Sequence, residues 1–235
     1  MVSAIIVAAG EGARMKGKMR KQYLNLSGRP VLAYSIMAFD SCSLIEEIFI
    51  VVPKEDIDYC QKKILSLLDL KKCIKLVQGG AERQDSVYNG LQEINKKNTE
   101  TVVIHDGVRP FINPEDLKEC ILGSKKYGAC ILATATVDTL KRVNESHIIA
   151  TTLPRENIWL AQTPQAFHYD LILKAHNAAR RNGYVGTDDA SLVERLGGKV
   201  KIINGSRFNI KITKKEDLDI AKAILKLRAD LKKNI

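Results

Sequence analysis

Hydrophobic and polar residues follow two rhythms along this chain. Short runs rich in valine and isoleucine predict buried β-strands at residues 4–8, 48–52, 74–77, 102–105, 129–133 and 200–203. Segments with apolar residues three or four positions apart predict helices at residues 31–39, 57–68, 83–94, 114–126, 171–181, 190–196 and 215–228. Strands that alternate with helices pair in parallel and need helices on both faces of the sheet. The pattern therefore predicts an α/β fold, a Rossmann-like three-layer α/β/α arrangement with a mostly parallel twisted sheet.

One stretch departs from this alternation. Two β-rich pieces, at residues 139–143 and 147–151, are joined by the polar turn Asn144-Glu145-Ser146 and predict a β-hairpin that protrudes from the sheet. Because its polar surface does not suit the core, we expect it to pack on a partner chain. No linker, repeat or low-complexity tract interrupts the sequence, so we expect one domain over residues 1–235 with residues 136–154 as an arm.

Composition excludes several classes of protein. Hydrophobic residues make up 45% and charged residues 27% of the 235 positions, as in ordinary globular domains. The five cysteines are scattered without a CxxC pair, which argues against a disulfide framework or a zinc site, so we expect them to be small core residues. The apolar run at residues 2–9 is too short to span a membrane. We therefore expect a cytoplasmic protein that makes no use of a membrane.

The formal net charge of +10 leaves three anionic partners open: nucleic acid, an acidic membrane surface, or a phosphate-rich small substrate. Much of the excess is lysine, which we interpret as solvated helix faces, at residues 62–63, 71–72, 96–97 and 232–233. No dense basic block with interleaved aromatic residues occurs. A non-catalytic nucleic-acid-binding protein is therefore the more distant alternative.

A glycine-rich segment, AAGEGARM at residues 8–15, follows the first predicted strand. Open α/β sheets bind ligands at the carboxyl ends of strands, where glycine permits positive φ and lets backbone N–H groups approach a phosphate. A dinucleotide-binding loop is disfavoured because Met15 replaces the third glycine of that motif. A P-loop is disfavoured because Met19 replaces the Ser or Thr that binds Mg²⁺. The turn at residues 26–30 also cuts short the helix that a P-loop requires.

Two interpretations of this segment remain when it is taken alone. It is either a nucleotidyltransferase loop, with Arg14 and Lys21 reaching the phosphates, or an ordinary turn between strand and helix with surface cations. The rest of the chain favours the first.

Nine motifs in a fixed order carry a resemblance to a known family. They are AAGxGxRM at residues 8–15, KQYL at 21–24, GGxxRxxSV at 79–87, HDxxRP at 105–110, DTxK at 138–141, Arg155, QTPQxF at 162–167, TDDA at 187–190 and NIKIT at 209–213. Together they resemble the 2-C-methyl-D-erythritol 4-phosphate cytidylyltransferases of the non-mevalonate isoprenoid pathway. One position departs from the family pattern, because Arg20 stands where proline is usual before Lys21. Losing the fixed φ of proline is expected to loosen the loop slightly.

The resemblance implies attack of a phosphomonoester oxygen on the α-phosphate of CTP, with release of pyrophosphate. The second pKa of such a phosphate is about 6, so near pH 7 it is mostly a dianion and needs no general base. Two anions must instead be brought together, a task that suits cations and Mg²⁺ or another divalent ion.

The resemblance also implies roles for individual residues. The expected catalytic residues are Arg14, Lys21, Arg155 and Lys211. The expected CTP-binding residues are Ala8, Ala9, Gly10, Gly12, Gly80, Arg83, Ser86 and Asp106. The expected substrate-binding residues are Asp106, Arg109, Thr139, Arg155, Thr187 and Lys211. Asp106 is the expected acid near the metal, which would be held mainly through the CTP phosphates.

In the resembling family the hairpin interlocks two subunits, so residues 136–154 are expected to be a dimerisation arm of a C2 homodimer. Thr139 and Arg155 would then serve the partner's CTP. We interpret Trp159 as a packing or interface residue. The segment at residues 162–165 is expected to shape a rigid turn without a chemical role.

The nearest rival function is that of ribitol 5-phosphate cytidylyltransferase. That relative tends to carry Ala-Gly-Gly where this chain has residues 8–10, and it lacks the pattern that residues 187–191 match. Simpler interpretations also exist for single residues: Asp106 and Arg109 form a structural ion pair, or Lys211 points to water.

Overall fold

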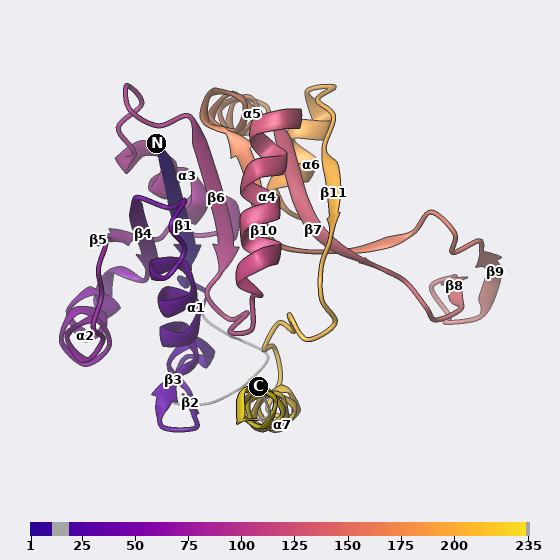
Figure 1. The fold of residues 1–235 in the computed structure, drawn as a ribbon. Helices are drawn as coiled ribbons and strands as arrows, with labels where there is room; N and C mark the ends of the chain where they lie inside the picture. The colour runs from indigo at the N-terminus through magenta and orange to yellow at the C-terminus, as the bar shows by residue number, and fades with distance from the viewer. Residues whose placement is uncertain (11–18, 234–235) are drawn as a thin grey trace.

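The computed structural model describes residues 1–10 and 19–233. Within these residues seven strands form one sheet in the order β11-β7-β10-β6-β1-β4-β5 (Figure 1). Their bounds are β1 Val2–Val7, β4 Glu47–Val52, β5 Cys73–Gln78, β6 Thr101–Asp106, β7 Ala129–Ala135, β10 Trp159–His168 and β11 Lys201–Asn204. Among these described strands β10 alone runs antiparallel, between β6 and β7. The predicted mostly parallel sheet is confirmed.

Helices cover both faces of this sheet, which confirms the three-layer fold. One face packs on α1 (Val31–Asp40), α2 (Ile57–Lys63) and α4 (Pro114–Tyr127). The other packs on α3 (Arg83–Glu93), α5 (Tyr169–Arg181) and α6 (Asp189–Arg195). The last helix, α7 (Glu216–Lys233), lies at the end of the molecule near the short hairpin of β2 (Asn25–Leu26) and β3 (Arg29–Pro30), as Figure 1 shows.

The side chains of β1 alternate between the two faces. Ala4 and Ile6 belong to the core cluster with α1, α2 and α4, whereas Ile5 and Val7 belong to the cluster with α3, α5 and α6. Because both faces are covered, every residue of β1 is buried, and all of them except Ser3 are apolar. Burial of one isoleucine side chain contributes roughly 1.5–3 kcal/mol. The core therefore holds rigidly the strand end from which the glycine-rich segment starts.

Local signals set most helix ends. α4 begins after Asn113, whose side chain accepts a hydrogen bond from the Glu115 N–H, and it has Pro114 at its first position. It ends at Gly128, which has a φ of 83°. These signals explain why the predicted helix at 114–126 agrees with the observed one.

The helix predicted at residues 57–68 is too long. α2 ends at Lys63, and Leu65–Leu67 form a separate 3-10 turn, η4. The Ser66 hydroxyl donates to the Lys62 carbonyl at 2.7 Å, so a side chain takes the acceptor that the next helical N–H would use. Periodicity alone does not reveal this competition.

The interpretation of residues 162–165 as a rigid turn is wrong. They lie inside β10, where the pairing with β7 is irregular between Ala161 and Gln165 and the Thr163–Pro164 peptide bond is cis. A proline among polar residues argues against a central strand, and so the sequence pattern concealed it. Here the irregularity accommodates the proline, and the strand separates β6 from β7.

The predicted hairpin is confirmed. β8 (Leu140–Val143) and β9 (Ile149–Leu153) pair antiparallel as a two-stranded sheet that stands away from the body (Figure 1). In the turn between them the Asn144 side chain accepts from the N–H groups of Ser146 and Ile148.

The expected core position of the cysteines holds for four of the five, because Cys73 is exposed and the others are buried. All five are free, in agreement with the expected lack of a disulfide framework. None of the described helices is long and apolar enough to cross a bilayer.

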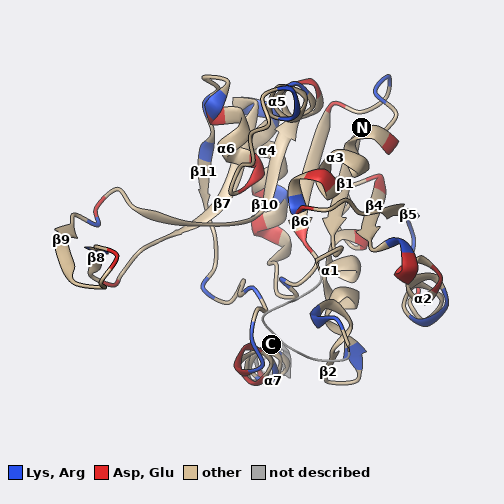
Figure 2. Cartoon of the chain, turned by 180° about the vertical axis from the view of Figure 1, so that it is seen from behind, with Lys and Arg blue, Asp and Glu red and all other residues tan. Residues whose placement is uncertain are grey.

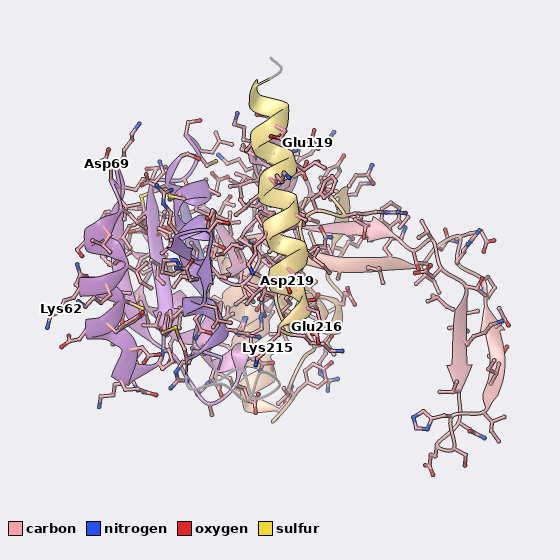
Figure 3. All side chains as sticks on the ribbon, turned by 90° about the horizontal axis from the view of Figure 1, so that it is seen from below. Lys62, Asp69, Glu119, Lys215, Glu216 and Asp219 are labelled. Atoms are coloured by element: carbon pink, nitrogen blue, oxygen red, sulfur yellow. The ribbon has the colours of Figure 1, made fainter. Side chains whose placement is uncertain are left out.

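The lysine pairs are only partly as expected. Lys62, at the outer side of α2, is solvated and pairs with Asp58 at 3.6 Å (Figure 3). Residues 71–72 and 96–97, however, lie in loops and not on helices. Figure 2 shows basic and acidic residues interleaved on α2, α5 and α7. The positive charge is therefore spread over these helices together with acidic residues.

Candidate functional site

A cavity of about 410 Å³ opens at the carboxyl ends of β1, β4, β5 and β6. Open α/β sheets bind ligands at this edge. The lining includes two of the expected catalytic residues, Lys21 and Lys211, and most residues expected to bind CTP: Ala8, Ala9, Gly10, Gly80, Arg83, Ser86 and Asp106. Gly12 and Arg14, also expected here, lie outside the described residues. Gly10 does not use the positive φ that glycine permits.

A second cavity of about 220 Å³ adjoins the first. The two share Arg83, Asp106 and Lys211. The second cavity adds two residues expected to bind the substrate, Arg109 and Thr187. The structure thus brings these residues together around one carboxylate, Asp106.

Asp106 ends β6 and lies among three cations. Its Oδ1 accepts from Arg83 Nε at 2.9 Å, and its Oδ2 lies 2.7 Å from Lys211 Nζ and 3.8 Å from Arg109 Nε. Burial by itself would raise the pKa of Asp106, but Arg83 and Lys211 outweigh it and hold that pKa far below its usual range. Asp106 is therefore an anion that fixes the positions of the cations around it.

Arg83 connects Asp106 to a second buried carboxylate. Its Nη1 donates to Asp189 Oδ2 at 2.8 Å, and Asp189 Oδ1 lies 3.1 Å from Nε2 of the buried His176. Asp189 stands next to Asp188, the N-cap of α6, so the helix start places it. The remaining Nη2 of Arg83 is buried without a protein partner among the described residues.

The loop after β5 is packed tightly against the end of β1. A Cβ built on Gly79 would lie 2.3 Å from the Ala9 Cβ, so only glycine fits here. The Gly80 N–H donates to Ser86 Oγ at 3.1 Å, and that hydroxyl donates to the Glu82 carbonyl. Ser86 thus also shapes the loop that carries Gly80.

Lys21 begins a short 3-10 helix, η2 (Lys21–Tyr23), at the wall of the larger cavity. Its neighbour Gln22 is buried and donates from Nε2 to the carbonyls of Ala8 and Gly10, at 2.6 and 3.2 Å. These bonds tie η2 to the segment that follows β1, which places Lys21 beside that segment.

Lys211 reaches the site from a long loop after β11. The next residue, Ile212, is fully buried, and its N–H donates to the Val108 carbonyl at 2.9 Å. On the other side, the Asn209 carbonyl accepts from Arg109 Nη1 at 2.7 Å. These anchors aim Lys211 at Asp106 and not at water.

A chain of hydrogen bonds through Thr163 connects His105 to the backbone of Asp106. The Arg109 carbonyl can only accept, so His105 Nε2, 3.0 Å away, carries the proton. Nδ1 then accepts from the Thr163 hydroxyl, whose oxygen accepts from the Asp106 N–H, each at 3.0 Å. Burial lowers the pKa of His105 to about 4, in agreement with a neutral imidazole.

Two expected site residues are not brought to these cavities. Thr139 and Arg155 belong to the arm region and are not among the described residues that line either cavity. The Arg155 guanidinium donates to the Val137 carbonyl at the base of the arm. Trp159, 37% exposed, also lies at this base, opposite Ala135 of β7.

Three residues of the site were not predicted from the sequence. Asp189 and His176 support Arg83, and Thr163 supports Asp106. The TDDA motif placed Asp189 beside a helix cap without revealing its partner. Thr163 was obscured by the expectation of a turn. A polar residue directly before a proline, next to an apolar strand end, was the available signal.

The described residues contain no group of three or more His, Cys, Asp or Glu side chains suited to holding a metal. Asp106 is the acid in the cavities that was expected near a metal, yet both of its oxygens already face cations. Because Mg²⁺ prefers several oxygen ligands, most would have to come from phosphates and water. The site fits a metal held chiefly by its ligand.

Comparisons with known proteins identify the family. The sequence model of the 2-C-methyl-D-erythritol 4-phosphate cytidylyltransferase family matches residues 2–227. The chain is 44% identical over 227 residues to the protein of that name from Pelotomaculum thermopropionicum, covering 97% of this chain and 95% of the relative. The corresponding protein from Caldanaerobacter subterraneus subsp. tengcongensis is 45% identical over 225 residues, covering 96% of this chain and 99% of the relative.

Solved structures give the same result. The fold is similar to 4-diphosphocytidyl-2C-methyl-D-erythritol synthase from Anaerococcus prevotii, with a TM-score of 0.84, 36% identity and 96% of each chain covered. The cytidylyltransferase from Thermus thermophilus matches with a TM-score of 0.78 and 29% identity, over 95% of this chain and 98% of that one. The chain therefore belongs to the 2-C-methyl-D-erythritol 4-phosphate cytidylyltransferase family.

Proposed function

We propose that this chain transfers the cytidylyl group of CTP to 2-C-methyl-D-erythritol 4-phosphate, giving 4-diphosphocytidyl-2-C-methyl-D-erythritol and pyrophosphate. An oxygen of the substrate phosphate forms a bond to the α-phosphorus of CTP. The bond from that phosphorus to the oxygen shared with the β-phosphate breaks, and pyrophosphate leaves. The observation that carries the proposal is the pair of adjoining cavities that share Arg83, Asp106 and Lys211 in a chain of this family.

The two cavities differ in size, and the larger substrate is assigned to the larger cavity. CTP occupies the larger one, against Ala8, Gly10 and the Gly80 loop, with Lys21 at its phosphates. The smaller polyol phosphate occupies the second cavity, beside Arg109 and Thr187. The shared wall is then the place where the attacking phosphate meets the α-phosphate.

The protein's task is to lower the repulsion between two anions. The attacking phosphate is a dianion near pH 7 and brings its own nucleophilic oxygen. Lys211, held 2.7 Å from Asp106, and Arg83 line both cavities and therefore stand at the junction. Preorganised cations stabilise developing charge without reorganising during the reaction. Arg14, in the segment expected to adjoin the triphosphate, belongs to the same proposal.

A divalent cation such as Mg²⁺ completes the proposal. It would be held by the CTP phosphates, with Asp106 nearby, and would neutralise charge on the triphosphate and the departing pyrophosphate. Because Asp106 already pairs with Arg83 and Lys211, it acts chiefly on those cations.

The active unit is proposed to be a C2 homodimer, formed through the arm at residues 136–154. Support comes from the arm's exposed apolar side chains, Val143, Ile148 and Ile149, which gain from burial against another chain. In the dimer Thr139 and Arg155 would complete the partner's site. The free cysteines suit a reducing compartment, so we place the reaction in the cytoplasm.

Pyrophosphate release tests the reaction directly. The chain is mixed with CTP, Mg²⁺ and either 2-C-methyl-D-erythritol 4-phosphate or ribitol 5-phosphate, and pyrophosphate is followed by a coupled assay. We expect rapid release only with the first polyol phosphate, and none when Mg²⁺ is chelated. Faster release with ribitol 5-phosphate would overturn the substrate assignment.

A further inference from the structure

Arg20 links the turn that carries Lys21 to a distant loop of the larger cavity. Its Nε lies 2.9 Å from Asp56 Oδ2, and its Nη2 contacts Glu55 Oε1. Both acids belong to the 3-10 helix η3 (Lys54–Asp56), which directly follows β4. Arg20, Lys21 and Glu55 all line the cavity. This ion-pair latch, Arg20 with Glu55 and Asp56, therefore joins two loops at the carboxyl edge of the sheet.

The two halves of the latch differ in strength. The Asp56 side chain is 18% exposed and that of Arg20 is 24% exposed, whereas Glu55 is 65% exposed. Ion pairs shielded from water are screened less than exposed ones. The contact with Asp56 is a charge contact and not an aligned hydrogen bond, because Asp56 Oδ2 lies outside hydrogen-bonding geometry. Asp56 therefore supplies most of the attraction, and Glu55 adds to it.

The latch acts on one side of Lys21. On the other side Gln22 is bonded to Ala8, and Tyr23 is buried, with its hydroxyl 3.3 Å from Cys60 Sγ. Burial, the Cys60 hydrogen bond and the charge of Asp56 all raise the pKa of Tyr23 above its usual range. Asp56 thus pairs with Arg20, directly before η2, and its charge also acts on Tyr23, the last residue of η2.

The backbone of Arg20 already has the shape of a proline. Its φ is −66° and its ψ is 144°, and the pyrrolidine ring imposes a φ of about −65°. The resembling family usually has proline here, and the chain reaches the same φ with arginine. The difference is physical: a ring restrains the backbone at any ionic strength, whereas an ion pair is screened by salt.

We infer that Arg20 is a positioning residue, whose ion pairs with Asp56 and Glu55 hold Lys21 at the triphosphate cavity in place of a ring restraint. The inference rests on the proposed function, in which Lys21 contacts the CTP phosphates. Because salt screens ion pairs, this latch makes kcat/KM depend on ionic strength, although none of its residues takes part in the reaction.

Two substitutions at one position separate restraint from charge. Arg20→Ala removes the latch and frees φ, whereas Arg20→Pro removes the same latch but restrains φ covalently. At low salt we expect Arg20→Ala to lower kcat/KM for CTP roughly fivefold, as for loss of about 1 kcal/mol of ion pairing. Arg20→Pro should stay within about twofold of the wild type. Both leave Asp56 without its cation, so a difference between them reports positioning and not the lost charge.

Salt supplies the second readout. As KCl rises to about 1 M, the wild type should fall toward Arg20→Ala, while Arg20→Pro should change less than the wild type. Lys62→Ala is the matched control, because it removes one positive charge and an exposed ion pair on neighbouring α2. Its kcat/KM and salt dependence should equal those of the wild type. Far-UV circular dichroism at the assay temperature checks that every variant is folded.

Two results would overturn the inference. One is wild-type kcat/KM in Arg20→Ala at low salt, and the other is equal loss in Arg20→Ala and Arg20→Pro. The affinity of each variant for CTP with Mg²⁺, measured by titration calorimetry, needs no acceptor, and it should follow the same order. If the wild type turned over no polyol phosphate, the proposed function would fail while this titration still tested the latch.

Discussion

The charged groups around Asp106 (the Asp106 region: Arg83, Asp106, Arg109, Asp189 and Lys211) differ from the arm in what their side chains contact. Around Asp106, the carboxylates of Asp106 and Asp189 are buried, and they pair with cations from distant segments of the chain. The arm carries exposed apolar residues on a two-stranded hairpin that touches little of the body, as Figures 1 and 3 show. In the first region the charged groups find their partners within one chain. The second gains stability only from something that covers it, because an isolated hairpin is marginal in water.

Substitutions in the two regions should therefore have different consequences. In the Asp106 region a lost partner leaves a buried charge uncompensated, so both stability and catalysis respond. In the arm a lost side chain leaves the body intact, and an effect arises only through a neighbour. The predictions below test that division.

The largest effect is expected at Asp189. Asp189→Asn removes the negative charge of a buried carboxylate, one of the two that hold the partly buried Arg83, which should lower the free energy of unfolding by about 3 kcal/mol. Chemical denaturation measures this value. The matched arm variant, Glu145→Gln in the exposed turn, should change it by less than about 0.5 kcal/mol. Equal effects of the two would remove the distinction between the regions.

Lys21→Ala is expected to lower kcat about a hundredfold, the usual result of removing one donor that stabilises a transition state. The melting temperature should stay close to that of the wild type, because Lys21 is not part of the core. Steady-state pyrophosphate release measures the loss, and Lys215→Ala, a solvent-exposed lysine at the start of the last helix region, is the control. A near-wild-type rate would remove Lys21 from the mechanism.

Stability should fall in mild acid because of His105. The unfolded imidazole has a pKa of about 6.5 and the folded one of about 4, so below pH 6.5 the unfolded state binds more protons. The stabilisation is present above this range and is lost as the pH falls toward 4. We expect a loss of about 2 kcal/mol between pH 7 and pH 5. Urea titrations at several pH values measure it.

Two histidine variants provide the test and the control for this prediction. His105→Gln should abolish most of the pH dependence, whereas His147→Gln, in the arm turn, should leave it unchanged. A slope that survives in His105→Gln would mean that other groups cause it.

The arm is tested by mixing two inactive variants. If Arg155 serves the partner's site, Lys21→Ala and Arg155→Ala homodimers that exchange subunits form hybrids with one intact site. About a quarter of all sites would then recover, and activity with them. Light scattering checks that the dimer persists. Recovery would show that the sites are shared, and a fully active monomer would contradict it.

Much of the fold followed from short-range patterns. The β1 run is apolar because both faces of the sheet are covered, and α4 ends where Gly128 permits a positive φ. The β10 strand could not be foreseen, because Pro164 and its polar neighbours are accommodated only where β6 and β7 leave a gap between them. Ser66 ended α2 early through a hydroxyl contact that competes with helical periodicity.

Part of the site, too, was predicted from the sequence, and part was not. The family resemblance assigned Lys21, Arg83, Asp106 and Lys211 to one site, and the structure lines one cavity with all four. Spacing could not reveal that Asp189, itself paired with His176, stands behind Arg83, since the Arg83–Asp189 contact joins residues 106 positions apart along the chain.

The sequence by itself determined the layers, most element bounds and the edge of the sheet where the chemistry gathers. These follow from periodicity, helix caps and the chain direction of parallel strands, which act over a few residues. Only the tertiary structure decided which charges meet: Asp106 with three cations, and Arg20 with the acids after β4. Electrostatic partners depend on distance in space and on burial, and neither can be read from position along the chain.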